Sequence, residues 1–197
     1  MSDPKTMFQL SGRGYPPTSL SHATLVIIDA QQEYLSGPLA LFEIDKAVAN
    51  IALLLQAART AGRPIVHVRH LGTVGGLFDP QGNRGQFIDG VGPQGDENVI
   101  EKRLPNAFNN TNLHQHLEGL GNVDLIVCGF MTHSSVSTTI RAAKDYGYRC
   151  TLVEDACATR DLPYKGGVLS AEQVKAVGMA TMADNFASVT TTARLLS

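Results

Sequence analysis

The chain has 197 residues, 43% of them hydrophobic, and this length suits one sizeable core better than two ordinary domains. Its 16 basic and 18 acidic residues give a formal net charge of -2, which excludes a strongly basic surface for nucleic acid or for an anionic membrane. The expected partner is therefore a small molecule or another copy of the chain. No apolar run reaches the roughly eighteen residues of a membrane span, and the N-terminus lacks the order of a signal peptide, so we expect a cytoplasmic protein.

Strand-like and helix-like segments alternate along the chain. A β-branched run at 24–28 precedes a helical period at 45–61 that Gly62 closes, and this pattern repeats. The other expected strands are 64–68, 123–128, 149–153 and 187–190, and the other expected helices are 110–120, 134–146 and 170–186. Such alternation predicts a parallel sheet covered by helices on both faces, with ligands bound at the carboxyl ends of the strands.

Two segments fall outside this alternation. Residues 1–22 contain glycine and proline without a clear period, which predicts an irregular N-terminal arm that could pack on a neighbouring subunit, and residues 23–197 are expected to form a single domain. The Gly-rich stretch 72–95 predicts a lid or one wall of a pocket. Its GxGxxG match at 90–95 is not interpreted as a dinucleotide site, because no strand precedes it and Pro93 lies within it. No cofactor is expected.

Neither the cysteines nor the histidines form a metal-binding pattern. His67 and His70 should point to opposite faces of a strand, and His114 and His116 to roughly opposite sides of a helix, so neither pair can easily chelate. His133 could line a pocket, cap a helix or act as a base. An odd number of cysteines without CxxC spacing indicates buried apolar thiols, which are Cys128, Cys150 and Cys157.

Chemically capable residues follow two of the expected strands. Asp29 comes directly after the strand 24–28, and the turn 129–135 comes directly after the strand 123–128. An acid in this place is either the cap of the next helix or a functional carboxylate. Lys102 is likewise either a surface lysine or a cation that keeps a nearby carboxylate ionised.

The phrases around these residues resemble the isochorismatase-like superfamily, and within it the cysteine-hydrolase branch that includes nicotinamidases. Three phrases carry the resemblance: D-x-Q-x-x-Y, K-x-x-x-x-A-F and a G-x-x-T-x-x-C-V turn, which correspond here to Asp29, Gln31 and Tyr34, to Lys102, Ala107 and Phe108, and to Gly129, Thr132 and Val136. A fourth matching stretch runs from Gly147 to Ala156. The sequence departs from the pattern at Ser135, which stands at the usual cysteine position.

The resemblance implies a three-layer, doubly wound, Rossmann-like α/β fold with a six-stranded parallel sheet, and a homo-oligomer, either a dimer or a tetramer. It implies that Asp29 is a base, that Lys102 is the accompanying cation, and that Ser135 holds the nucleophile position. A non-proline cis peptide between Phe130 and Met131 is implied as well, with the backbone N–H groups of Met131 and Ser135 forming an oxyanion hole. The implied substrate-binding residues are Gln31, Tyr34, Phe108, Thr132 and His133.

Serine in place of cysteine leaves three interpretations open, because a hydroxyl is much less acidic than a thiol. The leading one is hydrolysis of a small amide-like C–N bond, with Ser135 as the nucleophile or standing in for cysteine. The second is hydrolysis of a vinyl ether without a nucleophile, with Asp29 as general acid, as in the true isochorismatases. The third is a small-molecule-binding protein without catalysis. A dianionic substrate would need a further cation, for which Arg69, Arg84 and Arg103 are candidates near the site.

Overall fold

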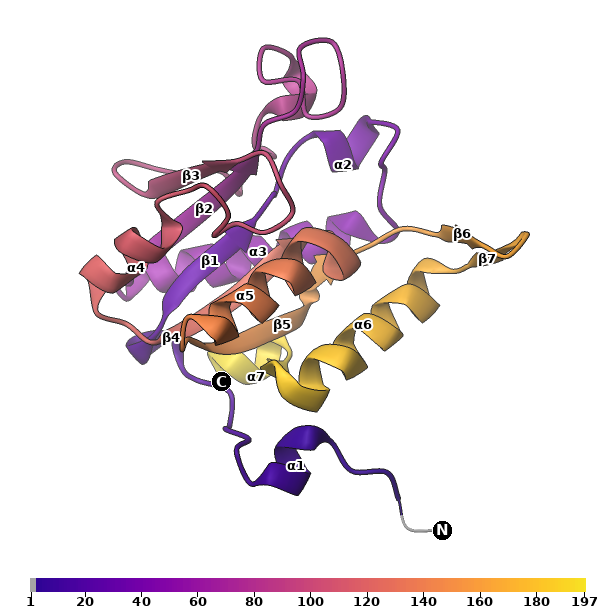
Figure 1. Ribbon diagram of the computed structural model, residues 1–197. Helices are drawn as coiled ribbons and strands as arrows, with labels where there is room; N and C mark the ends of the chain where they lie inside the picture. The colour runs from indigo at the N-terminus through magenta and orange to yellow at the C-terminus, as the bar shows by residue number, and fades with distance from the viewer. Residues whose placement is uncertain (1–2) are drawn as a thin grey trace.

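The computed structural model describes residues 3–197 and is built around one parallel sheet (Figure 1). The strand order is β3-β2-β1-β4-β5-β8. The strands are β1 (Thr24–Ile28), β2 (Ile65–His70), β3 (Asn98–Lys102), β4 (Asp124–Phe130), β5 (Arg149–Ala158) and β8 (Ala187–Thr190). The predicted six-stranded parallel sheet is confirmed.

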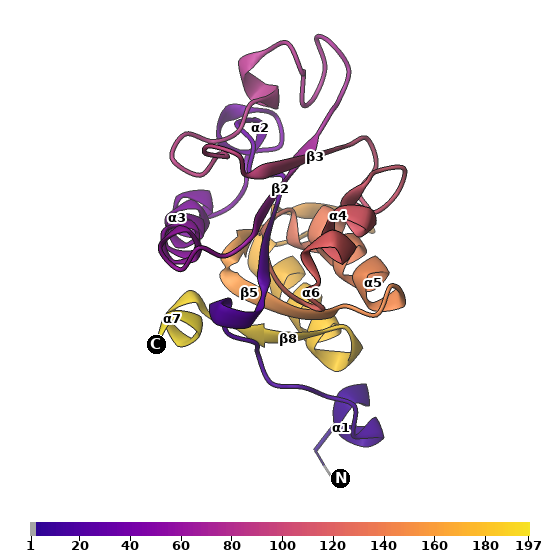
Figure 2. The same ribbon diagram turned by 90° about the vertical axis from the view of Figure 1, so that its left-hand side faces the viewer.

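Helices cover both faces of the sheet. Figure 2 shows α3 and α7 on one side and α4, α5 and α6 on the other. The α-helices are α1 (Met7–Ser11), α2 (Glu33–Ser36), α3 (Ile44–Thr60), α4 (Leu113–Leu120), α5 (Ser137–Asp145), α6 (Ala171–Asn185) and α7 (Thr192–Leu196). Two 3₁₀ helices, η1 (Leu20–His22) and η2 (Asn83–Gly85), and the π-helix η3 (Thr132–Val136) complete the helical elements, and β6 (Leu162–Tyr164) and β7 (Gly167–Leu169) form a projecting hairpin.

The core lies between the central strands and the helices packed on them. Every residue of β1 is buried, as expected for a β-branched strand covered on both faces. On the opposing α3, the buried side chains recur at helical spacing: Ile51, Leu54, Leu55 and Ala58. Within residues 3–197, none of the helices combines the length and the apolar character needed to cross a membrane.

The sixth strand, β3, is absent from the elements predicted by pattern alone. It is the edge strand next to β2, and only Ile100 and Lys102 of its five residues are buried. A short edge strand with a charged residue at its buried end has no continuous apolar run to identify it. The predicted helix 134–146 also differs, because its first turn belongs to η3 and α5 begins at Ser137.

The N-terminal arm is more ordered than the irregular segment predicted for residues 1–22, of which residues 1 and 2 lie outside the described residues. It contains α1, which begins with a capping box between Thr6 and Gln9 and ends at Gly12 in the left-handed conformation. The arm packs on its own chain: the Met7 N–H donates to Asp184 Oδ1 of α6 at 2.8 Å, and the Thr18 N–H donates to Thr151 Oγ1 of β5 at 2.9 Å.

Candidate functional site

Asp29, Lys102 and Ser135 meet at the carboxyl edge of the sheet. Asp29 follows β1, Lys102 ends β3, and Ser135 lies in η3 directly after β4. The Lys102 side chain reaches past the end of β2, so that Nζ lies 2.7 Å from Asp29 Oδ2 and 3.1 Å from Ser135 Oγ. The exposed fractions are 1%, 2% and 5% respectively, so the cluster is almost closed to water.

Burial dominates the electrostatics of Asp29. Desolvation raises the pKa of its carboxyl above the ordinary value, although the Lys102 charge and hydrogen bonds from Lys102 and Ser135 act in the opposite direction. Asp29 Oδ1 is buried and has no hydrogen-bond partner among residues 3–197. The backbone of Asp29 has a positive φ of 50°, which is uncommon outside glycine and clusters at functional sites. These features suit a carboxyl group that takes up and releases a proton.

Near the end of β4, position 129 requires glycine for a steric reason. Gly129 has a φ of 115°, and a Cβ there would lie 2.1 Å from the Ile28 carbonyl oxygen of β1. The next peptide bond, between Phe130 and Met131, is cis, at the position that the resemblance implies. Thr132 then donates its hydroxyl to the Ala158 carbonyl at 3.0 Å, and this bond ties the start of η3 to the end of β5. Thr132 therefore supports the turn through its side chain.

Gln31 does not present its amide to an open pocket. Its Nε2 donates to the carbonyl oxygens of His70 at 3.0 Å and Gly85 at 2.9 Å, and its Oε1 accepts from the His70 N–H at 2.8 Å. The side chain is fully buried and is committed to main-chain groups. In the structure Gln31 holds the end of β2, and a substrate contact for it stays a prediction.

His70 belongs to the site and was missed as a site residue by the sequence interpretation. Its Nδ1 lies 3.2 Å from Lys102 Nζ, whereas His67 points elsewhere and its Nε2 lies 2.8 Å from Glu97 Oε2. The expectation that the two histidines diverge is thus correct. The available signal for His70 was its place near the end of a predicted strand, at the same edge as Asp29.

The two aromatic residues predicted to bind substrate, Tyr34 and Phe108, lie in different surroundings. Tyr34 packs near the site, with its ring centroid 5.3 Å from that of Phe78 and 5.7 Å from that of Phe130. Burial, followed by the charges of Asp29 and Glu33, raises the pKa of the Tyr34 phenol well above its ordinary value.

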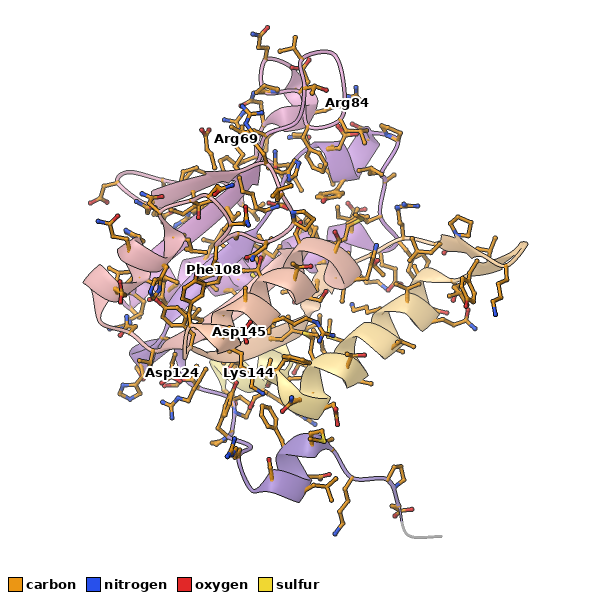
Figure 3. The ribbon with its side chains drawn as sticks, viewed as in Figure 1. Arg69, Arg84, Phe108, Asp124, Lys144 and Asp145 are labelled. Atoms are coloured by element: carbon orange, nitrogen blue, oxygen red, sulfur yellow. The ribbon has the colours of Figure 1, made fainter. Side chains whose placement is uncertain are left out.

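Phe108 lies on the side of α4 (Figure 3) and stacks on Tyr146 and Tyr148 at 5.0 and 5.9 Å between ring centroids. These contacts are not with the Asp29, Lys102 and Ser135 cluster, so a substrate contact for Phe108 stays a prediction.

His133 lies beside the cluster but faces another part of the molecule. Its Nδ1 is 2.6 Å from Thr159 Oγ1, and burial together with the Arg160 charge lowers the pKa of its imidazole. It borders a cavity of about 310 Å³ between α5, α6 and the β6–β7 hairpin. His133 thus lines a cavity in the structure, and a role as a helix cap or as a base stays a prediction.

Two of the three candidate arginines have acidic partners. Arg69 lies 3.5 Å from Glu101, and Arg84, which belongs to the Gly-rich stretch, lies 3.3 Å from Glu33 (Figure 3). Arg103 has no ion-pair partner among residues 3–197, and its charge acts on His70. Arg103 is therefore the cation of the three that is available to an anionic ligand.

The Gly-rich stretch 72–95 packs onto the residues around the site. The Phe78 N–H donates to the buried Glu33 Oε2 at 2.9 Å, and the Gly85 carbonyl oxygen accepts a hydrogen bond from the Gln31 amide. The stretch thus packs against residues near the site, and its role as a lid or as one wall of a pocket stays a prediction. In the described part of the chain, no group of three or more His, Cys, Asp or Glu side chains is arranged to hold a metal ion.

The fold and this cluster define the class: a doubly wound α/β protein with an acid, a lysine and a hydroxyl buried at the carboxyl edge of its sheet, an arrangement suited to hydrolysis. Residues 23–194 match the isochorismatase domain. The chain belongs to the isochorismatase family, whose members are hydrolases.

Individual proteins agree with this assignment. A crystal structure of an isochorismatase from Pseudomonas putida is 69% identical and superposes with a TM-score of 0.96, covering 98% of this chain and 100% of that one. The secreted isochorismatase effector Isc1 of Verticillium dahliae is 38% identical over 179 residues, which is 89% of this chain and 92% of the relative. Nicotinamidase 3 of Arabidopsis thaliana is 28% identical over 151 residues, which is 70% of this chain and 73% of the relative.

Proposed function

We propose that the protein hydrolyses an amide-like C–N bond of a small molecule at Asp29, Lys102 and Ser135. The observation that carries the proposal is the position of Lys102 Nζ within hydrogen-bond distance of both the Asp29 carboxylate and the Ser135 hydroxyl. The nicotinamidase among the relatives supports amide chemistry, since its name describes hydrolysis of an amide.

In the proposed reaction, Ser135 Oγ attacks the substrate carbonyl carbon while Asp29 accepts the hydroxyl proton. The backbone N–H groups of Met131 and Ser135 stabilise the oxyanion that forms. The C–N bond then breaks, Asp29 returns its proton to the leaving amine, and an acyl-serine remains. Water attacks this ester, with Asp29 again accepting a proton, and the acid is released as Ser135 regains its hydrogen. Lys102 holds Asp29 and Ser135 in place and balances the carboxylate charge.

A specific observation favours a second candidate, nucleophile-free hydrolysis of a vinyl ether. Burial raises the pKa of Asp29, and its unpartnered Oδ1 is a suitable place for a proton that the group donates as a general acid. The isochorismatase names of the two relatives above support this reaction. In this route, Asp29 protonates the terminal vinyl carbon, water adds to the resulting oxocarbenium ion and returns a proton to Asp29, and the hemiketal collapses to a ketone and an alcohol.

Three variants separate the candidates. Under the amide proposal, Ser135→Ala abolishes ammonia or amine release from a panel of small amides, and Ser135→Cys accelerates it over the parent. Under the ether proposal, Ser135→Ala keeps most turnover of a vinyl ether substrate, whereas Asp29→Asn abolishes it.

A panel on which Ser135→Cys gains nothing argues against the amide proposal. A large loss from Ser135→Ala on the vinyl ether argues against the second candidate. If every variant is inactive while a ligand still raises the melting temperature, the chain is a binding protein.

We further propose that the protein acts as a homo-oligomer, a dimer or tetramer, in the cytoplasm. Size-exclusion chromatography with light scattering measures the first property, and cell fractionation measures the second.

A further inference from the structure

Three potential acceptors surround the Lys102 ammonium. Asp29 Oδ2 lies at 2.7 Å, Ser135 Oγ at 3.1 Å and His70 Nδ1 at 3.2 Å. An ammonium group carries three N–H donors and no acceptor, so each neighbour can receive one hydrogen. His70 Nδ1 must then offer its lone pair to Lys102, which places the imidazole hydrogen on Nε2.

The His70 ring is held in this orientation from two sides. The Gln31 amide bonds both the N–H and the carbonyl of His70, at 2.8 and 3.0 Å, and thereby fixes its backbone. The Phe78 ring packs on the imidazole with 4.8 Å between centroids. Within residues 3–197, Nε2 of His70 has no hydrogen-bond partner, and it is not among the buried polar atoms that lack one. The Nε2–H donor is therefore free and reachable.

The imidazole is neutral near pH 7. Burial, followed by the charges of Lys102 and Arg103, lowers the pKa of His70 to about 4. A neutral ring beside the buried lysine adds a hydrogen-bond donor to the site without adding a second positive charge.

We propose that His70 serves the reaction as a neutral imidazole: Nδ1 fixes the Lys102 ammonium, and Nε2–H donates a hydrogen bond to an acceptor oxygen of the substrate. The substrate class is thereby narrowed to molecules with a carbonyl or carboxylate oxygen beside the scissile bond. Gln31 is a positioning residue that acts through His70. The substrate contact rests on the proposed hydrolytic function, whereas the bond between Nδ1 and Lys102 does not.

The tautomer can be tested without any substrate. In a long-range ¹H–¹⁵N spectrum of the full chain labelled at histidine, His70 should be the Nε2–H tautomer between about pH 5 and 8. The His70→Gln variant assigns its signals. Replacement of the cation by Lys102→Met should raise the His70 pKa, whereas the exposed Lys165→Met, a control, should leave it unchanged. A hydrogen on Nδ1, or a charged ring at pH 6, overturns the proposal.

Two substitutions of His70 by amide side chains of different length separate the two functions of the ring. His70→Asn keeps an acceptor near Nδ1 but loses the donor to the substrate, so it should raise KM about tenfold and lower kcat less. His70→Gln keeps a donor near Nε2 but loses the acceptor for Lys102, so it should lower kcat more than it raises KM. Equal effects of both variants on KM and kcat would overturn the substrate contact. If the parent turns over no amide or vinyl ether, the proposed function fails while the tautomer measurement still decides the role of Nδ1.

Discussion

At the scale of single residues, the site depends on two opposite charges that are almost completely buried. The free-energy cost of removing the Asp29 and Lys102 charges from water exceeds the stabilisation that a typical surface ion pair provides. Each charge is tolerated because the other is 2.7 Å away. Ser135 and His70 satisfy further hydrogen-bonding capacity of the lysine. The pair is therefore better understood as a device for positioning a proton acceptor than as a source of stability.

A double-mutant cycle on this pair should show strong coupling. Asp29→Asn or Lys102→Met alone leaves one uncompensated group in the core, and each should lower the free energy of unfolding by about 3–5 kcal/mol. The double variant should lose less than the sum, with a coupling energy of about 1–3 kcal/mol in urea unfolding. The more exposed pair Arg149 and Asp124 is the matched control and should couple much less. Additive losses at the buried pair would contradict this account.

At the scale of elements, a second charged cluster attaches the edge strand β3 to its neighbours. Glu97 directly precedes β3. Its carboxylate accepts a hydrogen bond from Arg59 Nε of α3 at 2.7 Å and lies 2.8 Å from His67 Nε2 of β2. The Gln94 N–H also donates to Glu97 at 3.0 Å. This cluster matters for the site because β3 carries Lys102 at its end.

The Glu97 cluster should make the protein sensitive to acid. Burial acts to raise the pKa of Glu97, but hydrogen bonds from Arg59, Gln94 and His67 outweigh it and lower the pKa to about 2. Because the folded pKa is depressed, the stabilisation is complete above the ordinary value of 4.5 and is lost as the pH falls towards about 2. We expect a loss of about 2 kcal/mol across this window, measured by urea unfolding at a series of pH values. Glu97→Gln should flatten the dependence, and an unchanged slope would refute the assignment.

The elements also show what the sequence could and could not predict. The β-branched run of β1 and its following acid located the sheet and Asp29, because buried parallel strands have an apolar signature. The edge strand β3 has no such signature, so Lys102 was found through its surrounding phrase instead. The Gln31 amide is bound to the main chain of His70, 39 positions away, and His70 contacts Lys102, 32 positions away. No local pattern encodes contacts over such separations.

At the scale of the whole molecule, the N-terminal arm and the site lie at opposite ends of the strands. The arm contacts the beginnings of β5 and β8: the Cys150 N–H donates to the Tyr15 hydroxyl at 3.1 Å, and the Ser188 hydroxyl donates to the Tyr15 carbonyl. The site lies where β1, β3 and β4 end. Figure 1 shows α1 below the sheet, on the side away from α2. The contacts of the arm are thus separated from the chemistry along the strand direction.

This separation predicts that changes in the arm affect stability without affecting the site. Tyr15→Phe removes a hydroxyl that serves the Cys150 main chain and should cost about 1 kcal/mol, or roughly 2–4 °C in melting temperature for a chain of this size. Removal of residues 1–18 should lower the melting temperature further, because the bond from the Thr18 N–H to Thr151 is lost as well. In both proteins the His70 tautomer and its pKa should match those of the full chain below the melting temperature. A change in either would mean that the arm acts on the carboxyl edge through the sheet, and the two edges would then have to be treated as one cooperative unit.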